Sequence, residues 1–264
     1  IAYYADSGRN ALFTVLASTG VWNRETAAAP DDVGKYSSLA RRSDGRWSSA
    51  FYEEDDQNLI LATRQGTASW SRETVDDSVG VGQYTSIGFD DSGVGYIAYY
   101  DRDNKHLLVA VQQPGGGWNR LIIDSAGSVG RYASLAFDSN GVAHIAYYDE
   151  TDKDLKIAIE SAAGGWTVDV IDADGDVGRY SSLAFGPDGA AHVSYEDQSN
   201  KDLKYATKTP AGSWVTRTID AAGDVGEHTS VAVDAEGNAH IAYYDKTNTN
   251  LKYAIIAGDR LAPQ

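Results

Sequence analysis

Apolar and polar positions alternate in short runs along the whole chain, and none has the three-to-four-residue spacing of an amphipathic helix. The run 132–138 places Leu135 and Phe137 on one face and small side chains on the other. A turn containing Gly141 leads to the run 144–149, which is rich in β-branched and aromatic residues. Two further runs follow at residues 155–159 and 166–171. The pattern therefore predicts four short antiparallel strands in succession.

A Val-Gly-x-Tyr motif starts each of these units and recurs every 48 residues without insertion or deletion. The copies begin at Val33, Val81, Val129, Val177 and Val225. In the last copy His228 replaces the tyrosine. A fixed period of this length indicates one supersecondary unit that is copied and stacked. Because each unit reads as a four-stranded meander, the sequence predicts an all-β fold, a β-propeller of four-stranded antiparallel blades.

Strand counting favours six blades in a single propeller domain that spans residues 1–264. Its predicted parts are a partial blade at 1–32, full repeats at 33–80, 81–128, 129–176 and 177–224, and a partial blade at 225–264. Five blades with a surplus hairpin, or part of a seven-bladed protein, are the alternatives. An unfinished seam leaves strand edges unpaired, and proteins normally cover such edges. We expect another chain, or residues upstream of Ile1, to complete the seam.

The repeat resembles a family of bacterial exported repeat propellers. Units of that family read approximately Asp-Val-Gly-x-Tyr-Ser-Ser-Leu-Ala, then His-Ile-Ala-Tyr-Tyr-Asp, then Asp-Leu-Lys-Tyr-Ala. The segment Asp224 to Asp245, followed by Leu251 to Ala254, matches this pattern well, and the resemblance covers residues 33–257. It implies the propeller fold. It implies no activity, because most members of the family have no assigned function.

The amino-acid composition limits the kinds of partner that the chain can bind. The net charge of −16 repels phosphate backbones and anionic lipid surfaces, so we expect no nucleic-acid partner. No window approaches the roughly 18 apolar residues of a membrane span, so we expect no membrane insertion. Cysteine is absent, which excludes disulfides and thiolate metal sites. Methionine is absent even at position 1, which fits a removed leader. We expect an exported protein, periplasmic or extracellular.

One face of the predicted propeller gathers the residues suited to ligand binding. Antiparallel strands place the loop before each Val-Gly-x-Tyr motif on the same side as the loop after the second strand. Tyrosine rings can stack on sugar faces, and carboxylates or arginines can bind hydroxyl groups. The candidate ligand residues are Tyr84, Tyr132, Tyr180, Arg131, Arg179, Asp101, Asp149 and Asp245. Alternatively, the tyrosines fill gaps between blades and bond to loop carbonyls.

The sequence matches known metal-binding patterns only in part. Asp172, Asp174 and Asp176 alternate around a glycine, as carboxylates do in short calcium loops, so calcium is a candidate. Leu183 stands where a bidentate Glu would complete that loop, which favours a polar turn. Histidines at equivalent positions of three blades lie too far apart to share a zinc ion, which indicates structural roles for His144, His192 and His240. We expect no other cofactor.

The predicted function is binding without catalysis, with a glycan or small polar ligand recognised at the Tyr/Asp face. A structural or accessory subunit that docks to a partner protein is the first alternative. An enzyme, of the polysaccharide lyase type, is the second. His228 and Glu196 depart from the repeat and are the candidate acid and base for that enzyme.

Overall fold

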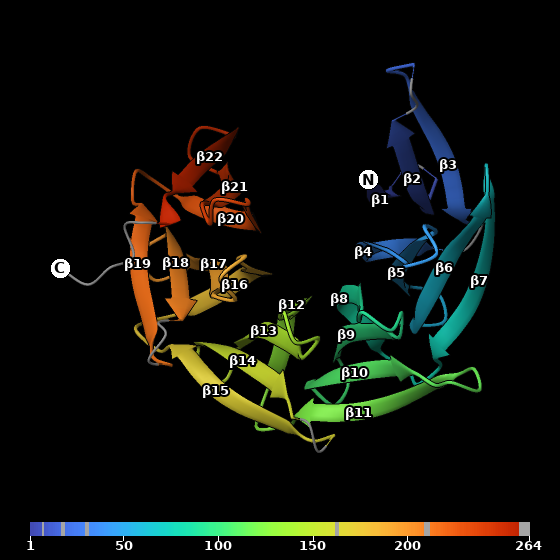
Figure 1. Cartoon of the computed structure of the whole chain (residues 1–264), viewed down its shortest axis with the longest axis horizontal. Helices are drawn as coiled ribbons and strands as arrows, with labels where there is room; N and C mark the ends of the chain where they lie inside the picture. Colours follow the sequence, from blue (N-terminus) through green and yellow to red (C-terminus); the bar gives the residue numbers. More distant parts are fainter. Residues whose placement is uncertain (7, 17–18, 30–31, 162–163, 209–211, 259–264) are drawn as a thin grey trace. The chain divides into compact units, whose positions relative to one another are not determined.

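A computed structural model of the chain describes residues 1–6, 8–16, 19–29, 32–161, 164–208 and 212–258 (Figure 1). The described residues form 22 strands in six antiparallel sheets. The chain divides into two compact units, Ile1–Ala126 and Gly127–Gln264, and each holds three sheets. None of the described residues belongs to a helix long and apolar enough to cross a membrane.

The first unit contains one three-stranded sheet and two four-stranded sheets, each a meander of consecutive strands. The first sheet consists of β1 (Ala2–Ala5), β2 (Asn10–Leu16) and β3 (Trp22–Ala28). The second consists of β4 (Val33–Arg41), β5 (Trp47–Glu53), β6 (Asn58–Gly66) and β7 (Ser69–Asp76). The third consists of β8 (Val81–Phe89), β9 (Gly95–Asp101), β10 (His106–Gln112) and β11 (Trp118–Asp124).

The second unit repeats this construction in the opposite order, with its three-stranded sheet last. Its first sheet consists of β12 (Val129–Phe137), β13 (Ala143–Asp149), β14 (Asp154–Glu160) and β15 (Trp166–Asp172). The second consists of β16 (Val177–Phe185), β17 (Ala191–Asp197), β18 (Asp202–Lys208) and β19 (Trp214–Asp220). The last consists of β20 (Val225–Val233), β21 (Ala239–Asp245) and β22 (Asn250–Ile256).

The prediction of an all-β fold with six four-stranded blades, two of them incomplete, is confirmed by these sheets. The first sheet lacks the strand that carries the Val-Gly-x-Tyr motif, and the last lacks the fourth strand. Within each unit the motif strands of adjacent sheets lie side by side, as β12 and β16 do. No further strand pairs with β22 among the described residues.

The Val-Gly-x-Tyr motif joins each sheet to the one before it. In the copy at β16, the amide of Val177 donates a 2.9 Å hydrogen bond to the carbonyl of Lys153. Gly178 has φ +109°, and a Cβ there would lie 2.8 Å from Cα of Leu155. Only glycine permits this approach of two backbones. Tyr180 has a left-handed backbone, φ 54°, which interrupts the regular pairing of β16 with β17.

The hydrophobic core lies in layers between adjacent sheets of each unit. In the second unit one layer contains Leu155, Ile157, Val177 and Leu183, all buried. Serines repeated at 48-residue spacing add polar links between sheets. Each serine Oγ accepts a hydrogen bond from a backbone amide of the next sheet. The pairs are Ser38 with Ile87 at 3.1 Å, Ser134 with Leu183 at 2.9 Å, and Ser182 with Val231 at 3.0 Å. These serines therefore link adjacent sheets at those three positions.

Candidate functional site

The motif rings pack against one another in tilted pairs and form one column in each unit. In the second unit Tyr132 packs on Tyr180 with ring centroids 4.6 Å apart, and Tyr180 packs on His228 at 4.4 Å. In the first unit Tyr36 and Tyr84 stack in the same way. All five residues have φ between 52° and 55°, and a left-handed backbone costs a side-chain-bearing residue about 1–2 kcal/mol. The motif therefore holds its rings in a strained conformation. A ligand role for Tyr84, Tyr132 and Tyr180 stays a prediction.

The two candidate arginines bind side chains of neighbouring loops. Arg131 Nη1 donates to Glu150 Oε1 at 2.6 Å. Arg179 donates from Nη1 to Gln198 Oε1 at 3.2 Å and from Nη2 to Asp176 Oδ2 at 3.1 Å. Both guanidinium groups thus tie the motif strand to the turn that follows the second strand. Binding of a ligand by Arg131 or Arg179 stays a prediction.

The three candidate aspartates at strand ends are buried and accept backbone hydrogen bonds from the turns they begin. For Asp101, Asp149 and Asp245 the donors are the amides of Asn104, Thr151 and Asn248, at 2.9, 2.8 and 2.9 Å. Lys156 Nζ also lies 2.5 Å from Asp149 Oδ2. These contacts give the carboxylates a structural role in the turns, and their predicted contact with a ligand stays untested.

The acidic loop proposed for calcium has protein partners at its first carboxylate. Asp172 Oδ2 accepts from Tyr195 Oη and Lys204 Nζ, both at 2.6 Å. Its other oxygen accepts the amide of Asp174 at 3.1 Å, as in an ordinary polar turn. Asp176 binds a tyrosine and an arginine, described next. Calcium binding by Asp172, Asp174 and Asp176 therefore stays a prediction.

A tyrosine, an aspartate and a basic side chain meet where adjacent sheets join. Tyr148 Oη donates to Asp176 Oδ1 at 2.7 Å, across the join between two sheets. Arg179 binds the other oxygen of Asp176, and its guanidinium lies 5.4 Å from the centroid of the Tyr148 ring. In the first unit Tyr4 and Asp32 repeat the 2.7 Å hydrogen bond, again with a cation beside the carboxylate. Each carboxylate is thus supplied with a donor and a positive charge.

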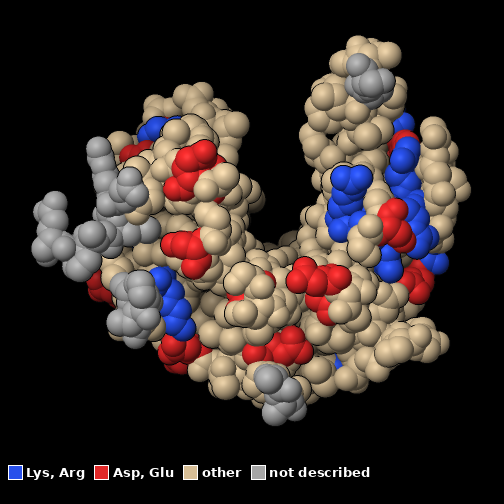
Figure 2. All heavy atoms as spheres, viewed as in Figure 1, with Lys and Arg blue, Asp and Glu red and all other residues tan. Residues whose placement is uncertain are grey.

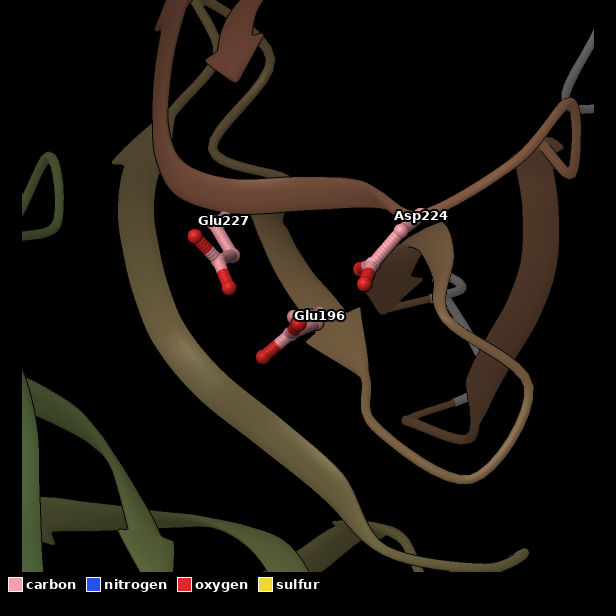
Figure 3. A group of neighbouring side chains, drawn as sticks. All are labelled: Glu196, Asp224 and Glu227. Atoms are coloured by element: carbon pink, nitrogen blue, oxygen red, sulfur yellow. The ribbon is translucent and has the colours of Figure 1, made fainter. Parts of the chain in front are cut away.

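At the join between the last two sheets the same positions carry three acids. Glu196 on β17 occupies the place of Tyr148, Asp224 that of Asp176, and Glu227 on β20 that of Arg179. One carboxylate oxygen from each residue lies within 4.8 Å of the other two. Figure 3 shows the three side chains converging from β17 and from the start of β20. Two substitutions in the repeat have therefore created an acidic cluster, which we call the carboxylate cluster.

Glu196 is the buried member of the cluster. Its residue surface is 1% exposed, and neither carboxylate oxygen has a hydrogen-bond partner within the protein. Burial raises the pKa of Glu196 to about 7, and the charges of Glu227 and Asp224 act in the same direction against the opposing effect of Arg179 and Lys246. Glu196 therefore exchanges a proton near neutral pH, as general acids and bases do.

The other two acids have basic partners. Lys246 Nζ donates to Glu227 Oε1 at 2.7 Å, and Lys201 Nζ donates to Asp224 Oδ2 at 3.2 Å. The pair formed by Glu227 and Lys246 reverses the charges found at the equivalent positions of earlier repeats, such as Arg131 with Glu150. This exchange of charges keeps an ion pair between the two positions and places the acid, Glu227, where the last two sheets join. Figure 2 shows separate groups of Asp and Glu on one face of the second unit.

The two residues proposed for an enzyme have different contacts in the structure. Glu196 belongs to the carboxylate cluster, whereas His228 is exposed and stacks its ring on Tyr180. Sequence reasoning missed Asp224 and Lys246 as members of the site. Aligning the repeats at 48 residues supplies the missing signal, because it reveals acids at the tyrosine and arginine positions of one join.

Two of the three repeated histidines, His192 and His240, bind partners in their own sheets, and the ring of His144 packs on Phe185 of the next sheet. His192 Nδ1 and Tyr205 Oη are 2.5 Å apart, and His240 Nε2 lies 2.9 Å from Asp234 Oδ2. Burial lowers the pKa of His144 and His192. These contacts agree with the structural role predicted for the histidines.

Comparison with known proteins identifies the fold. No family model and no curated protein matches the sequence. A mutant of AofleA from Arthrobotrys oligospora is a similar solved structure, with 14% identity, a TM-score of 0.62, and coverage of 97% of this chain and 81% of that one. An endo-arabinase from Bacteroides thetaiotaomicron has 13% identity and a TM-score of 0.52, with coverage of 84% and 93%. An exo-β-1,3-galactanase from Phanerochaete chrysosporium has 13% identity and a TM-score of 0.53, with coverage of 93% and 64%.

These identities show the β-propeller fold alone, and they agree with the predicted fold class. They also correct the predicted function. The similar structures are mostly named as enzymes, among them an exo-1,5-α-L-arabinanase and an α-L-arabinofuranosidase, which contradicts the prediction of a non-catalytic binding propeller. The prediction of binding without catalysis was therefore wrong, and it rested on ring, arginine and aspartate positions that recur between repeats.

Proposed function

We propose that the chain is a carbohydrate-active enzyme that hydrolyses glycosidic bonds at the carboxylate cluster. The observation that carries the proposal is Glu196, a buried carboxyl group without a hydrogen-bond partner, with a pKa raised to about 7, beside the carboxylate of Glu227. Glycoside hydrolysis uses such a pair, one protonated acid and one ionised carboxylate at the scissile bond.

The environments of the two groups suggest their roles. Glu196 holds a proton up to about pH 7 because burial disfavours its charged form, so it is the proton donor to the leaving oxygen. Glu227 forms an ion pair with Lys246 and is less buried than Glu196, so we assign it as the carboxylate that faces the anomeric carbon. Glu227 is partly exposed and His228 beside it is exposed, so a sugar can approach Glu227 from this side, and it contacts the buried Glu196 only when the side chains around Glu196 move.

The short separation of the acids favours a retaining reaction. The nearest oxygens of the cluster lie within 4.8 Å of one another. Carboxyl groups of retaining enzymes are about 5–5.5 Å apart, whereas inverting enzymes need about 6.5–9.5 Å to admit a water molecule between acid and base. Glu227 would then attack the anomeric carbon, and water would hydrolyse the glycosyl–Glu227 ester with Glu196 as the base.

The shared fold of the similar structures supports a carbohydrate substrate. Proteins of similar fold include a galactanase and arabinases, so a propeller of this kind can act on a glycan. The column of Tyr132, Tyr180 and His228 ends beside the cluster in sequence, because His228 directly follows Glu227. The column supplies ring faces on which sugars stack.

The proposal is tested by hydrolysis of a panel of aryl glycosides and plant and microbial polysaccharides. We expect turnover that declines above about pH 7, as Glu196 loses its proton, and a reduction of at least 100-fold in Glu196→Gln and Glu227→Gln. The matched control is Glu150→Gln, since the chain already carries Gln198 at the equivalent place. Wild-type activity in both cluster variants, or no turnover across the panel, would reject the proposal.

A further inference from the structure

The carboxylate cluster combines three acids with one buried, unsatisfied side chain. Both oxygens of Glu196 are enclosed by protein and accept no hydrogen bond from it, and the side chain points into the space between Asp224 and Glu227 (Figure 3). A buried carboxylate without a partner costs several kcal/mol, so native proteins supply it with a donor, a proton or a cation. The repeat supplies none here, because Glu196 stands where other joins have a tyrosine hydroxyl.

We propose that Glu196, Asp224 and Glu227 bind a calcium ion. Two oxygens on opposite sides of a Ca²⁺ ion, each about 2.4 Å from it, are about 4.8 Å apart. The cluster oxygens all fall within that separation, so one ion between them is within reach of the three acids. Carboxylates only, from two different sheets, form the all-oxygen ligand set that hard cations prefer.

The dimensions and the partners of the cluster favour calcium over magnesium. Mg²⁺ requires oxygens at about 2.0–2.1 Å in near-ideal octahedral geometry, whereas Ca²⁺ accepts irregular sets of six to eight oxygens.

The side chains of Lys246 and Lys201 are 54% and 55% exposed, so both ammonium groups can move into solvent when a cation enters. Arg179 donates its hydrogen bonds to Asp176 and Gln198, and it acts on Glu196 through its charge alone.

Calcium would also regulate the site. If Glu196 is the proton donor, a bound cation occupies its oxygens and inhibits hydrolysis, and this consequence rests on the proposed function. The binding itself does not, since it follows from the geometry of the three acids.

The test is isothermal titration calorimetry of the whole chain with CaCl₂ and, separately, with MgCl₂. We expect one Ca²⁺ ion per chain, weaker Mg²⁺ binding, and at least tenfold weaker Ca²⁺ binding in Glu196→Gln and in Asp224→Asn. Two controls should leave binding unchanged. Glu150→Gln removes an acid from an equivalent repeat, and Asp174→Asn alters the acidic loop before β16. Thermal unfolding with and without CaCl₂ confirms that each variant is folded.

The outcomes separate this inference from the proposed function. The absence of Ca²⁺ binding by the folded wild-type chain, or binding abolished by Asp174→Asn and retained by Glu196→Gln, overturns the calcium site even if hydrolysis is observed. Ca²⁺ binding that depends on Glu196 supports the site even if no glycan is hydrolysed.

Discussion

The phenolic hydroxyl of Tyr148 donates a 2.7 Å hydrogen bond to Asp176, a carboxylate that precedes the next sheet. One repeat later the same geometry places Glu196 against Asp224. A donor has been replaced by a second acid, in a buried position, and the repeat gains a reactive group at the expense of a structural hydrogen bond. Polar groups left without partners inside proteins are frequently functional.

Restoring the repeat at this position should stabilise the protein. In Glu196→Tyr the phenol can donate to Asp224 as Tyr148 does to Asp176, and the buried unsatisfied carboxyl group disappears. We expect the free energy of unfolding to rise by about 1–3 kcal/mol at pH 8, with loss of hydrolysis. Denaturant unfolding and glycosidase assays measure the two effects. Tyr148→Phe is the converse control, with an expected loss of about 1 kcal/mol. A destabilised, fully active Glu196→Tyr would contradict the role assigned to Glu196.

Glu196 should make the folded chain less stable as pH rises. Its pKa is raised from an ordinary value of 4.5 to about 7, so between these values the native state binds more protons than the unfolded state. The free energy of unfolding therefore falls as pH increases through this window, and the contribution of Glu196 is at most about 3 kcal/mol. Urea titrations from pH 4 to pH 8 should show this decline in the wild type and a smaller decline in Glu196→Gln. Parallel curves for the two proteins would show that the pKa of Glu196 is not raised.

Reversing the ion pair of Glu227 and Lys246 should separate stability from catalysis. Glu227→Lys places two ammonium groups together and should cost about 0.5–1 kcal/mol, since the pair is partly exposed. Adding Lys246→Glu recreates the arrangement of Lys35 with Glu54, where the two groups are 3.1 Å apart, and should recover the loss. Hydrolysis should be absent from both variants. Recovered activity in the double variant would show that Glu227 is not catalytic, and unfolding curves report the stability.

Gly178 should tolerate no side chain. In Gly178→Ala the new Cβ would lie 2.8 Å from Cα of Leu155, and φ is +109°, so both overlap and backbone strain oppose the change. We expect a loss of at least about 2 kcal/mol in the free energy of unfolding. The matched control is Gly237→Ala, where φ is +81° and no heavy atom lies within 4 Å, so only about 1 kcal/mol should be lost. Equal losses in the two variants would show that the contact with Leu155 is unimportant.

The strands could be predicted from the sequence because their signals are local. Alternation over five to nine residues, a glycine in each turn and an unbroken 48-residue period define four strands in each complete repeat. The six sheets follow from counting those strands. The left-handed conformation of Tyr180 could not be predicted in this way, because tyrosine rarely adopts it and it coincides with an irregularity in the pairing of β16 with β17.

The candidate site was only half accessible to sequence reasoning. Glu196 and His228 were recognised as departures from the repeat, but their side chains belong to different groups in the structure. Asp224 looked like an ordinary repeat position, since the same aspartate elsewhere accepts a tyrosine hydroxyl. Glu196, which lies on another sheet, gives it a new chemical environment.

By itself the sequence determined the period, the strands and their grouping into six sheets, because hydrophobic alternation and glycine positions act over a few residues. Only the tertiary structure decided which acids meet. Glu196 and Glu227 are separated by 31 positions and belong to different sheets, and their distance depends on how β17 and β20 pack. Burial at that join, which no local pattern encodes, then raises the pKa of Glu196 and gives the site its chemistry.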